Sequence, residues 1–357
     1  MSKQIRVLVV DDSALVRKIT TDILESDPQI KVIGTANNGK TAIYKNEELD
    51  PDVITMDIEM PILDGLSALK AIIETRPKPV IMMSVLTQHG ADATFKALDL
   101  GAVDFIPKPS SMLSLSVDEI GDLLITKVKS VAGITVAKRA QKKDPEIMKM
   151  VGPQLEDVVK NRVFGKESKS QKVVGIGTST GGPSALLQVF KAFPENFPAP
   201  VLVVQHMPEG FTKAFADRLN SSSYLDIKEA EDGDRALPGC GFIAPGHSHL
   251  LLEKRRNDLV VRVVKGEKVS GHRPSIDVLF NSLAETVGRE TVAVIMTGMG
   301  KDGADGIGYI RKSGGYTIAQ NEETSVVFGM NRVAVEKGGV KEVVPLSDIT
   351  KKIVEHI

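Results

Sequence analysis

The chain has 357 residues, a length typical of two domains, and its 42% hydrophobic and 25% charged residues are those of an ordinary globular protein. Lys and Arg total 45 against 46 Asp and Glu, so the charge balance does not indicate binding to nucleic acid or to an acidic membrane surface. No apolar stretch resembles a signal peptide or a membrane span, and the single cysteine, Cys240, cannot form an intramolecular disulfide, so we expect a cytoplasmic protein.

The first 130 residues alternate short apolar runs with segments of helical spacing. The runs are Ile5–Val10, Lys31–Ala36, Val53–Asp57, Pro79–Val85 and Val103–Pro107. Apolar residues recur every three or four positions between them, and the last predicted helix covers Val117–Val131. Five such alternations predict a doubly wound parallel sheet of five strands with helices on both faces.

Polar side chains follow several of these strands. Asp11 and Asp12 come directly after the first strand, and Asp57 ends the third. In the strand order 2-1-3-4-5 these two strands are neighbours, and a crevice opens at their carboxyl ends. Three converging carboxylates need a neutralising cation, and Mg²⁺ is a hard ion that prefers oxygen ligands. Ser84 and Lys108, after strands four and five, could stabilise a phosphoryl group there.

An Asp at the end of a strand is, taken singly, more often a turn or cap residue, but the combination is specific. With the loop Met60–Gly65, it resembles the flavodoxin-like receiver domains of bacterial response regulators over nearly the whole of residues 1–130. The resemblance implies that Asp57 accepts a phosphoryl group. It also implies roles for the neighbouring residues: Mg²⁺ ligands Asp11, Asp12, Asp57 and the backbone carbonyl of Glu59, a switch pair Ser84 and Phe105, and a phosphoryl contact from Lys108.

Residues 131–171 differ in amino-acid composition from the residues that precede them. They are rich in charge and include Lys138-Arg139, Gly152-Pro153 and Lys166–Ser170. The basic residues are few, mixed with acidic ones and free of interleaved aromatic residues, which favours a solvated linker over a nucleic-acid contact. We therefore expect the second domain to span residues 172–357.

This second domain shows another alternating pattern. The predicted strands are Val173–Gly177, Pro200–Gln205, Gly241–Ala244, Thr291–Thr297 and Thr317–Ala319, with a hairpin at Leu250–Glu253 and Val260–Val264. The pattern predicts an α/β domain with a mainly parallel sheet.

Three side chains with complementary chemistry follow three of these strands. Ser179 lies in a G-x-S-x-G sequence, the pattern of a nucleophile elbow, and His206 and Asp302 follow the second and fourth strands. Parallel strands can bring a nucleophile, a base and an orienting carboxylate together at one edge. Singly, a helix-cap serine and a turn aspartate are more common. A dinucleotide-binding loop is the alternative at Gly175-x-Gly177, but the next strand ends in Gln and His rather than an acid.

The chain from Lys172 onward resembles the methylesterase domain of the chemotaxis protein-glutamate methylesterases, the CheB family. The matching stretches are Gly177–Gly182, Gln205–Phe211, Glu229–Gly233, His272–Phe280, Thr297–Gly303 and Ala319–Gly329. The resemblance implies a triad of Ser179, His206 and Asp302, an oxyanion hole that includes the backbone N–H of Met299, and no cofactor in the esterase site.

The resemblance also implies a function. Glutamate 5-methyl esters on chemoreceptors would be hydrolysed with release of methanol, and some family members also deamidate receptor glutamine, which the sequence leaves open. A chemotaxis histidine kinase would phosphorylate Asp57 and so loosen the packing of the receiver over the esterase cleft. Neither nucleic acid nor membrane insertion is expected. A DNA-binding second domain would need a basic recognition helix, which we do not find, and a non-catalytic scaffold is disfavoured by the complete triad.

Overall fold

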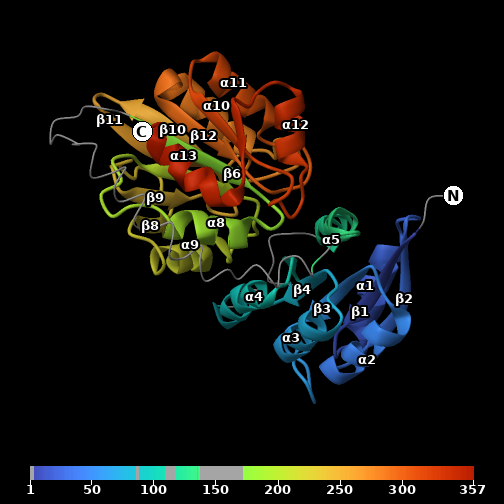
Figure 1. Ribbon diagram of the computed structural model, residues 1–357. Coiled ribbons are helices and arrows are strands. Elements are labelled where there is room, and N and C mark those ends of the chain that lie inside the picture. The colour runs from blue at the N-terminus through green and yellow to red at the C-terminus, as the bar shows by residue number, and fades with distance from the viewer. Residues whose placement is uncertain (1–3, 86–87, 109–116, 135, 137–171) are drawn as a thin grey trace. The chain divides into compact units, whose positions relative to one another are not determined.

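The computed structural model describes residues 4–85, 88–108, 117–134, 136 and 172–357 (Figure 1). The chain divides into two compact units, Met1–Asp144 and Pro145–Ile357. Most of the predicted linker lies outside the described residues. Among the helices that are described, none combines the length and the apolar character needed to cross a bilayer.

The N-terminal unit is built on one parallel sheet with the strand order β2-β1-β3-β4-β5. Its strands are β1 (Ile5–Val10), β2 (Ile30–Ala36), β3 (Val53–Asp57), β4 (Val80–Ser84) and β5 (Asp104–Pro107). Its helices are α1 (Ala14–Glu25), α2 (Gly39–Leu49), α3 (Gly65–Thr75), α4 (Gln88–Leu100) and α5 (Val117–Val131). The predicted doubly wound fold is confirmed, and the strand ends agree within one residue.

The burial of the sheet explains why its strands could be recognised in the sequence. Every residue of β3 and β4 is buried, because helices cover both faces of a doubly wound sheet. Such strands appear in the sequence as continuous apolar runs. Ser13, Asn38 and Asp64 then begin α1, α2 and α3, each with a side-chain oxygen that accepts a backbone N–H of the first turn.

A buried ion pair joins α5 to β5. Lys127 Nζ lies 2.8 Å from Asp104 Oδ1, and the two side chains are only 9% and 3% exposed. The same ammonium group donates a hydrogen bond of 3.0 Å to the carbonyl of Phe105. Each charge is therefore compensated only by its partner and a few dipoles, so the loss of one partner would leave a buried charge unpaired.

The C-terminal unit contains a seven-stranded, wholly parallel sheet in the order β14-β13-β12-β6-β7-β9-β8. Its strands are β6 (Val173–Thr178), β7 (Val201–Gln205), β8 (Asp226–Glu229), β9 (Cys240–Ile243), β12 (Thr291–Ile295), β13 (Tyr316–Gln320) and β14 (Glu342–Val344). An antiparallel hairpin, β10 (His249–Arg255) and β11 (Asp258–Val264), forms separately. The predicted parallel sheet and hairpin are confirmed, whereas β8 and β14 were not predicted, since both are short, partly exposed edge strands.

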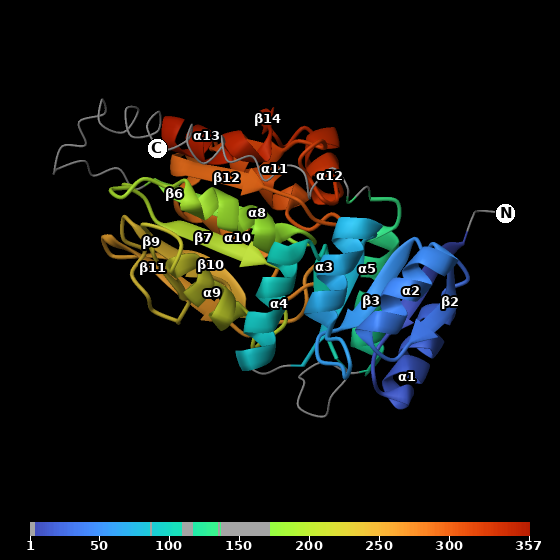
Figure 2. The ribbon, with the colours of Figure 1, turned by 60° about the horizontal axis from the view of Figure 1, so that its bottom comes forward.

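Helices cover both faces of this sheet (Figures 1 and 2). The helices are α8 (Gly182–Lys191), α9 (Thr212–Asn220), α10 (Ile276–Thr286), α11 (Ala304–Lys312), α12 (Met330–Glu336) and α13 (Ile349–Glu355). Helix α8 packs with α9 and α13, while α11 packs with α10 and α12. The sheet runs outward in both directions from β6 and β12, so the loops after β6, β7 and β12 meet at its carboxyl edge.

The buried ion pair yields a testable expectation. Replacing Lys127 by Met should lower the free energy of unfolding of the N-terminal unit by about 3–5 kcal/mol, because the Asp104 carboxylate stays buried without its cation. Hydrogen exchange of the β5 and α5 amides in urea measures this free energy. The double variant Lys127→Met/Asp104→Asn is the matched control and should recover most of the loss. Equal losses in the single and double variants would contradict this account of the pair.

Candidate active site and phosphorylation site

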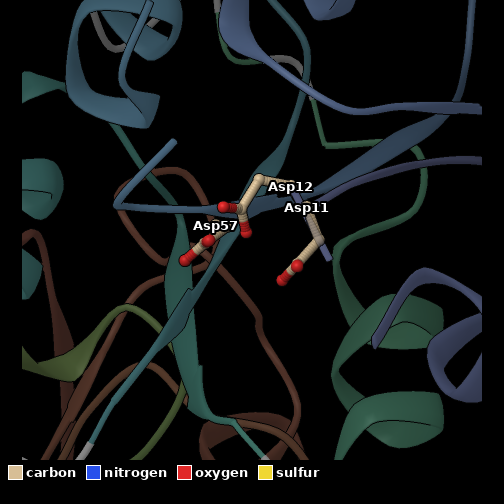
Figure 3. Close-up of side chains that lie close together, drawn as sticks. All are labelled: Asp11, Asp12 and Asp57. Atoms are coloured by element: carbon tan, nitrogen blue, oxygen red, sulfur yellow. The ribbon is translucent and has the colours of Figure 1, made fainter. Parts of the chain in front are cut away.

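Three carboxylates gather at the carboxyl ends of β1 and β3 in the N-terminal unit (Figure 3). One oxygen each from Asp11, Asp12 and Asp57 lies within 4.8 Å of the other two, with Asp11 and Asp57 buried and Asp12 exposed. Two oxygens bound to one Mg²⁺ at about 2.1 Å lie about 3 to 4 Å apart. Small side-chain rotations would therefore bring all three into one coordination sphere, and the donor set fits the ion.

One lysine provides the positive charge at this cluster. Lys108 Nζ lies 2.7 Å from Asp57 Oδ2 and 2.8 Å from Asp11 Oδ2. Burial raises the pKa of Asp57 to about 6, with help from the charge of Asp11, although the ammonium of Lys108 acts in the opposite direction. The single positive charge of Lys108 therefore does not balance the negative charges of the three carboxylates. This excess of negative charge favours the binding of a divalent cation.

The two residues of the predicted switch pair are both held against α4. Ser84 Oγ accepts a hydrogen bond of 2.7 Å from Thr94 Oγ1 and lies 3.2 Å from the carbonyl oxygen of Gly90. The buried ring of Phe105 packs edge-to-face on that of Phe95 at 6.3 Å between centroids. The Ser84 hydroxyl is therefore engaged by α4.

The loop after β3 approaches Asp57 closely. The backbone N–H of Glu59 donates to the Asp57 carboxylate, and the Glu59 side chain is exposed. A Cβ at Gly65, where α3 begins, would lie 1.9 Å from the Asp57 carbonyl oxygen. Glycine is required there because the start of α3 lies directly against the end of β3.

In the C-terminal unit, Ser179 follows β6 in a sharp turn. Its N–H donates to the carbonyl of Thr297 at 3.0 Å, and Gly181 begins α8 with a φ of 77°. The loop after β12 lies against it, since a Cβ at Gly298 would be 2.8 Å from Ser179 Cβ. Met299 comes directly after this glycine, so its backbone lies beside the serine.

Gln205 connects the loop of the serine to the loop of the histidine. Its buried side-chain Nε2 donates to the carbonyl of Ser179 at 3.0 Å and to that of His206 at 2.9 Å. The N–H of His206 also donates to the carbonyl of Thr178 at 3.1 Å. This role could not be recognised in the sequence, since a Gln at the end of a strand carries no specific signal.

His206 uses its two ring nitrogens differently. Nε2 lies 2.8 Å from Asp302 Oδ2, and the two side chains are 9% and 0% exposed. Nδ1 is buried and has no hydrogen-bond partner in the described part of the chain. With Nε2 bound to the carboxylate, Nδ1 is the nitrogen left to accept a proton. Hydrogen bonds of this kind are often absent until a substrate binds.

Asp302 lies at the N-terminus of α10. Its Oδ1 accepts from Ser275 Oγ at 2.8 Å and from the Asp277 N–H at 3.1 Å, and its Oδ2 accepts from the Ile276 N–H at 2.7 Å. Burial by itself would raise the pKa of Asp302, but the hydrogen bond and charge of His206, together with the α10 donors, lower that pKa to about 2. The carboxylate is therefore a permanent anion that can orient His206 and stabilise its protonated form.

A second buried carboxylate completes a reciprocal pair of helix caps. Asp277, in the first turn of α10, accepts a hydrogen bond of 2.8 Å from the N–H of Gly306 in α11. Asp302, just before α11, caps α10 in return. Burial raises the pKa of Asp277, and the charge of Asp302 adds to this effect. A Ser before an apolar helical segment is a cap signal that could have identified Ser275, whereas Asp277 carried no such signal.

Both units match known protein families. Residues 174–353 match the CheB methylesterase family, and residues 7–117 match the response regulator receiver domain. The protein-glutamate methylesterase/protein-glutamine glutaminase of Pyrococcus horikoshii is 46% identical over 357 residues, which are 100% of this chain and 95% of that protein. The protein of the same name from Halalkalibacterium halodurans is 45% identical over 356 residues, 100% of this chain and 99% of that one.

A solved structure resembles the C-terminal unit. The crystal structure of the Thermotoga maritima CheB methylesterase catalytic domain is 45% identical, with a TM-score of 0.52, and covers 53% of this chain and 100% of that one.

The electrostatics of Asp302 predict a pH-dependent stability. A pKa lowered from 3.8 to about 2 is worth about 2–3 kcal/mol to the folded state above pH 4, and this contribution is lost as the pH falls through about 2. Urea unfolding at pH 2 to 6 should therefore show a stability gap between wild type and Asp302→Asn that narrows at low pH.

Asp277→Asn is the matched control for this measurement. Because the pKa of Asp277 is raised, the stability that its protonated form contributes is lost as the pH rises through that pKa. Wild type should therefore lose stability relative to Asp277→Asn with rising pH. A gap for Asp302→Asn that does not change with pH would contradict the assigned ionisation.

Proposed function

The chain belongs to the CheB methylesterase family, and on this premise we propose that it is a phosphorylation-regulated protein-glutamate methylesterase that acts on methylated chemoreceptors. The observation that carries the proposal is the buried pair of His206 and Asp302 at the carboxyl edge of the sheet. The loop that holds His206 is joined to the Ser179 turn by the hydrogen bond from Gln205 to the Ser179 carbonyl. The names of the relatives also include protein-glutamine glutaminase activity, and the same triad would serve for glutamine.

The proposed reaction uses Ser179 as the nucleophile. Its Oγ attacks the ester carbonyl carbon while His206 Nδ1 takes the hydroxyl proton, and Asp302 stabilises the resulting imidazolium. The methoxide leaves with that proton as methanol, and a glutamyl ester of Ser179 remains. Water then attacks this ester with His206 again as base, which releases the glutamate carboxylate and restores the serine.

The negative oxygen formed in each step needs a hydrogen-bond donor. Within the described residues, the N–H of Met299 donates no hydrogen bond, and its loop lies beside Ser179. We assign this N–H to the oxyanion hole, where one donor is typically worth 10²- to 10³-fold in rate. The esterase chemistry requires no cofactor.

The proposed control acts through Asp57, with a chemotaxis histidine kinase as the phosphodonor. Asp11, Asp12, Asp57 and the backbone carbonyl of Glu59 would hold Mg²⁺, which would neutralise charge on the incoming phosphoryl group. Lys108 already contacts Asp57 and would contact the phosphoryl oxygens.

The switch would then start at Ser84. Its hydroxyl would exchange the Thr94 hydroxyl and Gly90 carbonyl for a phosphoryl oxygen, and the Phe105 ring would move with it. Phosphorylation would thereby shift the population between conformations of different esterase activity.

We also propose domain boundaries and a location. The receiver would span residues 1–130, the linker 131–171 and the catalytic domain 172–357, in agreement with family matches at 7–117 and 174–353. A cytoplasmic location suits the lone cysteine and a kinase partner. No contact with nucleic acid and no membrane insertion enters the proposed function.

The function is tested by methanol release from methylated receptor membranes, with and without acetyl phosphate and Mg²⁺. Release should rise with the phosphodonor, disappear in Ser179→Ala and lose its response in Asp57→Asn. The Asp57→Asn variant controls for direct effects of acetyl phosphate on the catalytic unit. If Ser179→Ala retains the release, the esterase assignment is wrong, and if wild type releases none, a non-catalytic scaffold is the better description.

The Gln205 bridge gives a second expectation for the same assay. Gln205→Met keeps the length of the side chain but leaves two buried carbonyls without their donor. We expect kcat to fall by about 10- to 100-fold, because small displacements of catalytic groups cost that much, with KM changed by less than about 3-fold. An unchanged kcat in a correctly folded variant would show that the two loops keep their geometry without the bridge.

A further inference from the structure

A second histidine lies flat against the proposed base. The rings of His206 and His272 are stacked, with centroids 3.8 Å apart and planes 10° from parallel. His272 is half-buried. The structure places this ring on the face of the proposed triad imidazole.

The chain holds His272 in place from its N-terminal side by a tight hairpin. Val269 and His272 exchange two backbone hydrogen bonds of 2.9 and 3.0 Å. The two residues between them, Ser270 and Gly271, have φ angles of 53° and 81°. Two positive φ angles in a two-residue loop are those of a type I′ turn, a rigid connection.

On the other side of His272, the chain is fixed to the triad itself. Ser275 donates its hydroxyl to Asp302 Oδ1 at 2.8 Å and its N–H to His249 Nδ1 at 3.2 Å. The loop that carries His272 thus ends three residues later on the carboxylate that binds His206. The backbone on this side of His272 is therefore anchored to the same carboxylate that binds His206.

The stack supplies a constraint that the hydrogen bonds of His206 do not. The Nε2 contact with Asp302 fixes one point on the edge of the ring, and Nδ1 has no hydrogen bond in the described part of the chain. A ring held at one point can still tilt, which would move Nδ1 by a large fraction of an ångström. A parallel ring in van der Waals contact removes this tilt.

We propose that His272 is a positioning residue for the esterase reaction: its ring fixes the plane of His206 and so holds Nδ1 toward the Ser179 hydroxyl. The inference rests on the proposed function and deepens it. His272 acts through its aromatic face and transfers no proton.

The test separates the ring contact from the chemistry of the imidazole nitrogens. The full chain, with acetyl phosphate and Mg²⁺, is treated with a fluorophosphonate. In this reaction the Ser179 Oγ–P bond forms, the P–F bond breaks, fluoride leaves and His206 takes the serine proton. The labelling rate therefore reports the Ser179–His206 pair without a receptor. Methanol release is measured in parallel for kcat and KM.

Three substitutions give distinct expectations. His272→Ala should slow labelling and lower kcat by about 10- to 100-fold with KM nearly unchanged, because the base loses its fixed plane. His272→Phe restores a flat ring without a titratable group and should recover labelling to within about 3-fold of wild type. His272→Arg places a permanent positive charge against the His206 ring, whose other charged contact is Asp302. This charge should disfavour protonation of His206 and so move the acid limb of the pH–rate profile to lower pH.

A stacked histidine elsewhere in the same unit provides the matched control. The ring of His356 stacks on that of Tyr316, with centroids 3.4 Å apart, and belongs to no part of the proposed site. His356→Ala should label at the wild-type rate.

Several outcomes would overturn the proposal. These are wild-type labelling in His272→Ala, a His272→Phe variant as slow as His272→Ala, or equal slowing in His356→Ala. The failure of the proposed function is separate and visible in Ser179→Ala, which would then still be labelled or still release methanol.

Discussion

The Asp302 carboxylate, buried without access to water, is the group on which the catalytic unit depends. It accepts four hydrogen bonds, from His206 Nε2, Ser275 Oγ and the N–H groups of Ile276 and Asp277. A buried anion is stable only with such compensation. Its donors come from the loop after β7 and from the start of α10. Because all of them bind one carboxylate, they fix the positions of these two segments relative to the loop after β12, which carries Asp302. The position of the proposed base His206, the cap of α10 and the end of the loop that carries His272 all depend on this carboxylate.

The carboxyl edge of the N-terminal sheet presents the opposite electrostatic situation. Asp57 is also buried, yet its main cationic partner is one lysine that it shares with Asp11, and burial raises its pKa to about 6, whereas that of Asp302 is about 2. A fully compensated carboxylate suits a permanent structural anion. An undercompensated one suits a site that receives a divalent cation and a phosphoryl group. The same parallel-sheet geometry therefore supports two chemistries, and the number of donors around the carboxylate distinguishes them.

The sequence predicted those parts of the structure that leave a local signal. Strands such as β3 and β4 are buried on both faces and appear as apolar runs. Ser179, His206 and Asp302 could be proposed as a triad because each follows such a buried strand. The edge strands β8 and β14 have no such signal. The Gln205 bridge, the Asp277 cap and the His272 stack depend on the direction of side chains that meet only in the folded chain. The contact of His206 Nε2, rather than Nδ1, with Asp302 is a feature of the same kind.

The tautomer of His206 is the most direct test of this account. Nitrogen-15 NMR of the full-length protein at pH 8 distinguishes protonated from unprotonated ring nitrogens, and the loss of one set of signals in His206→Gln identifies this residue among the six histidines. We predict that Nε2 carries the proton, in a hydrogen bond to Asp302, and that Nδ1 is unprotonated. A proton on Nδ1, with Nε2 unprotonated, would contradict the assignment of the base nitrogen and the role given to Asp302.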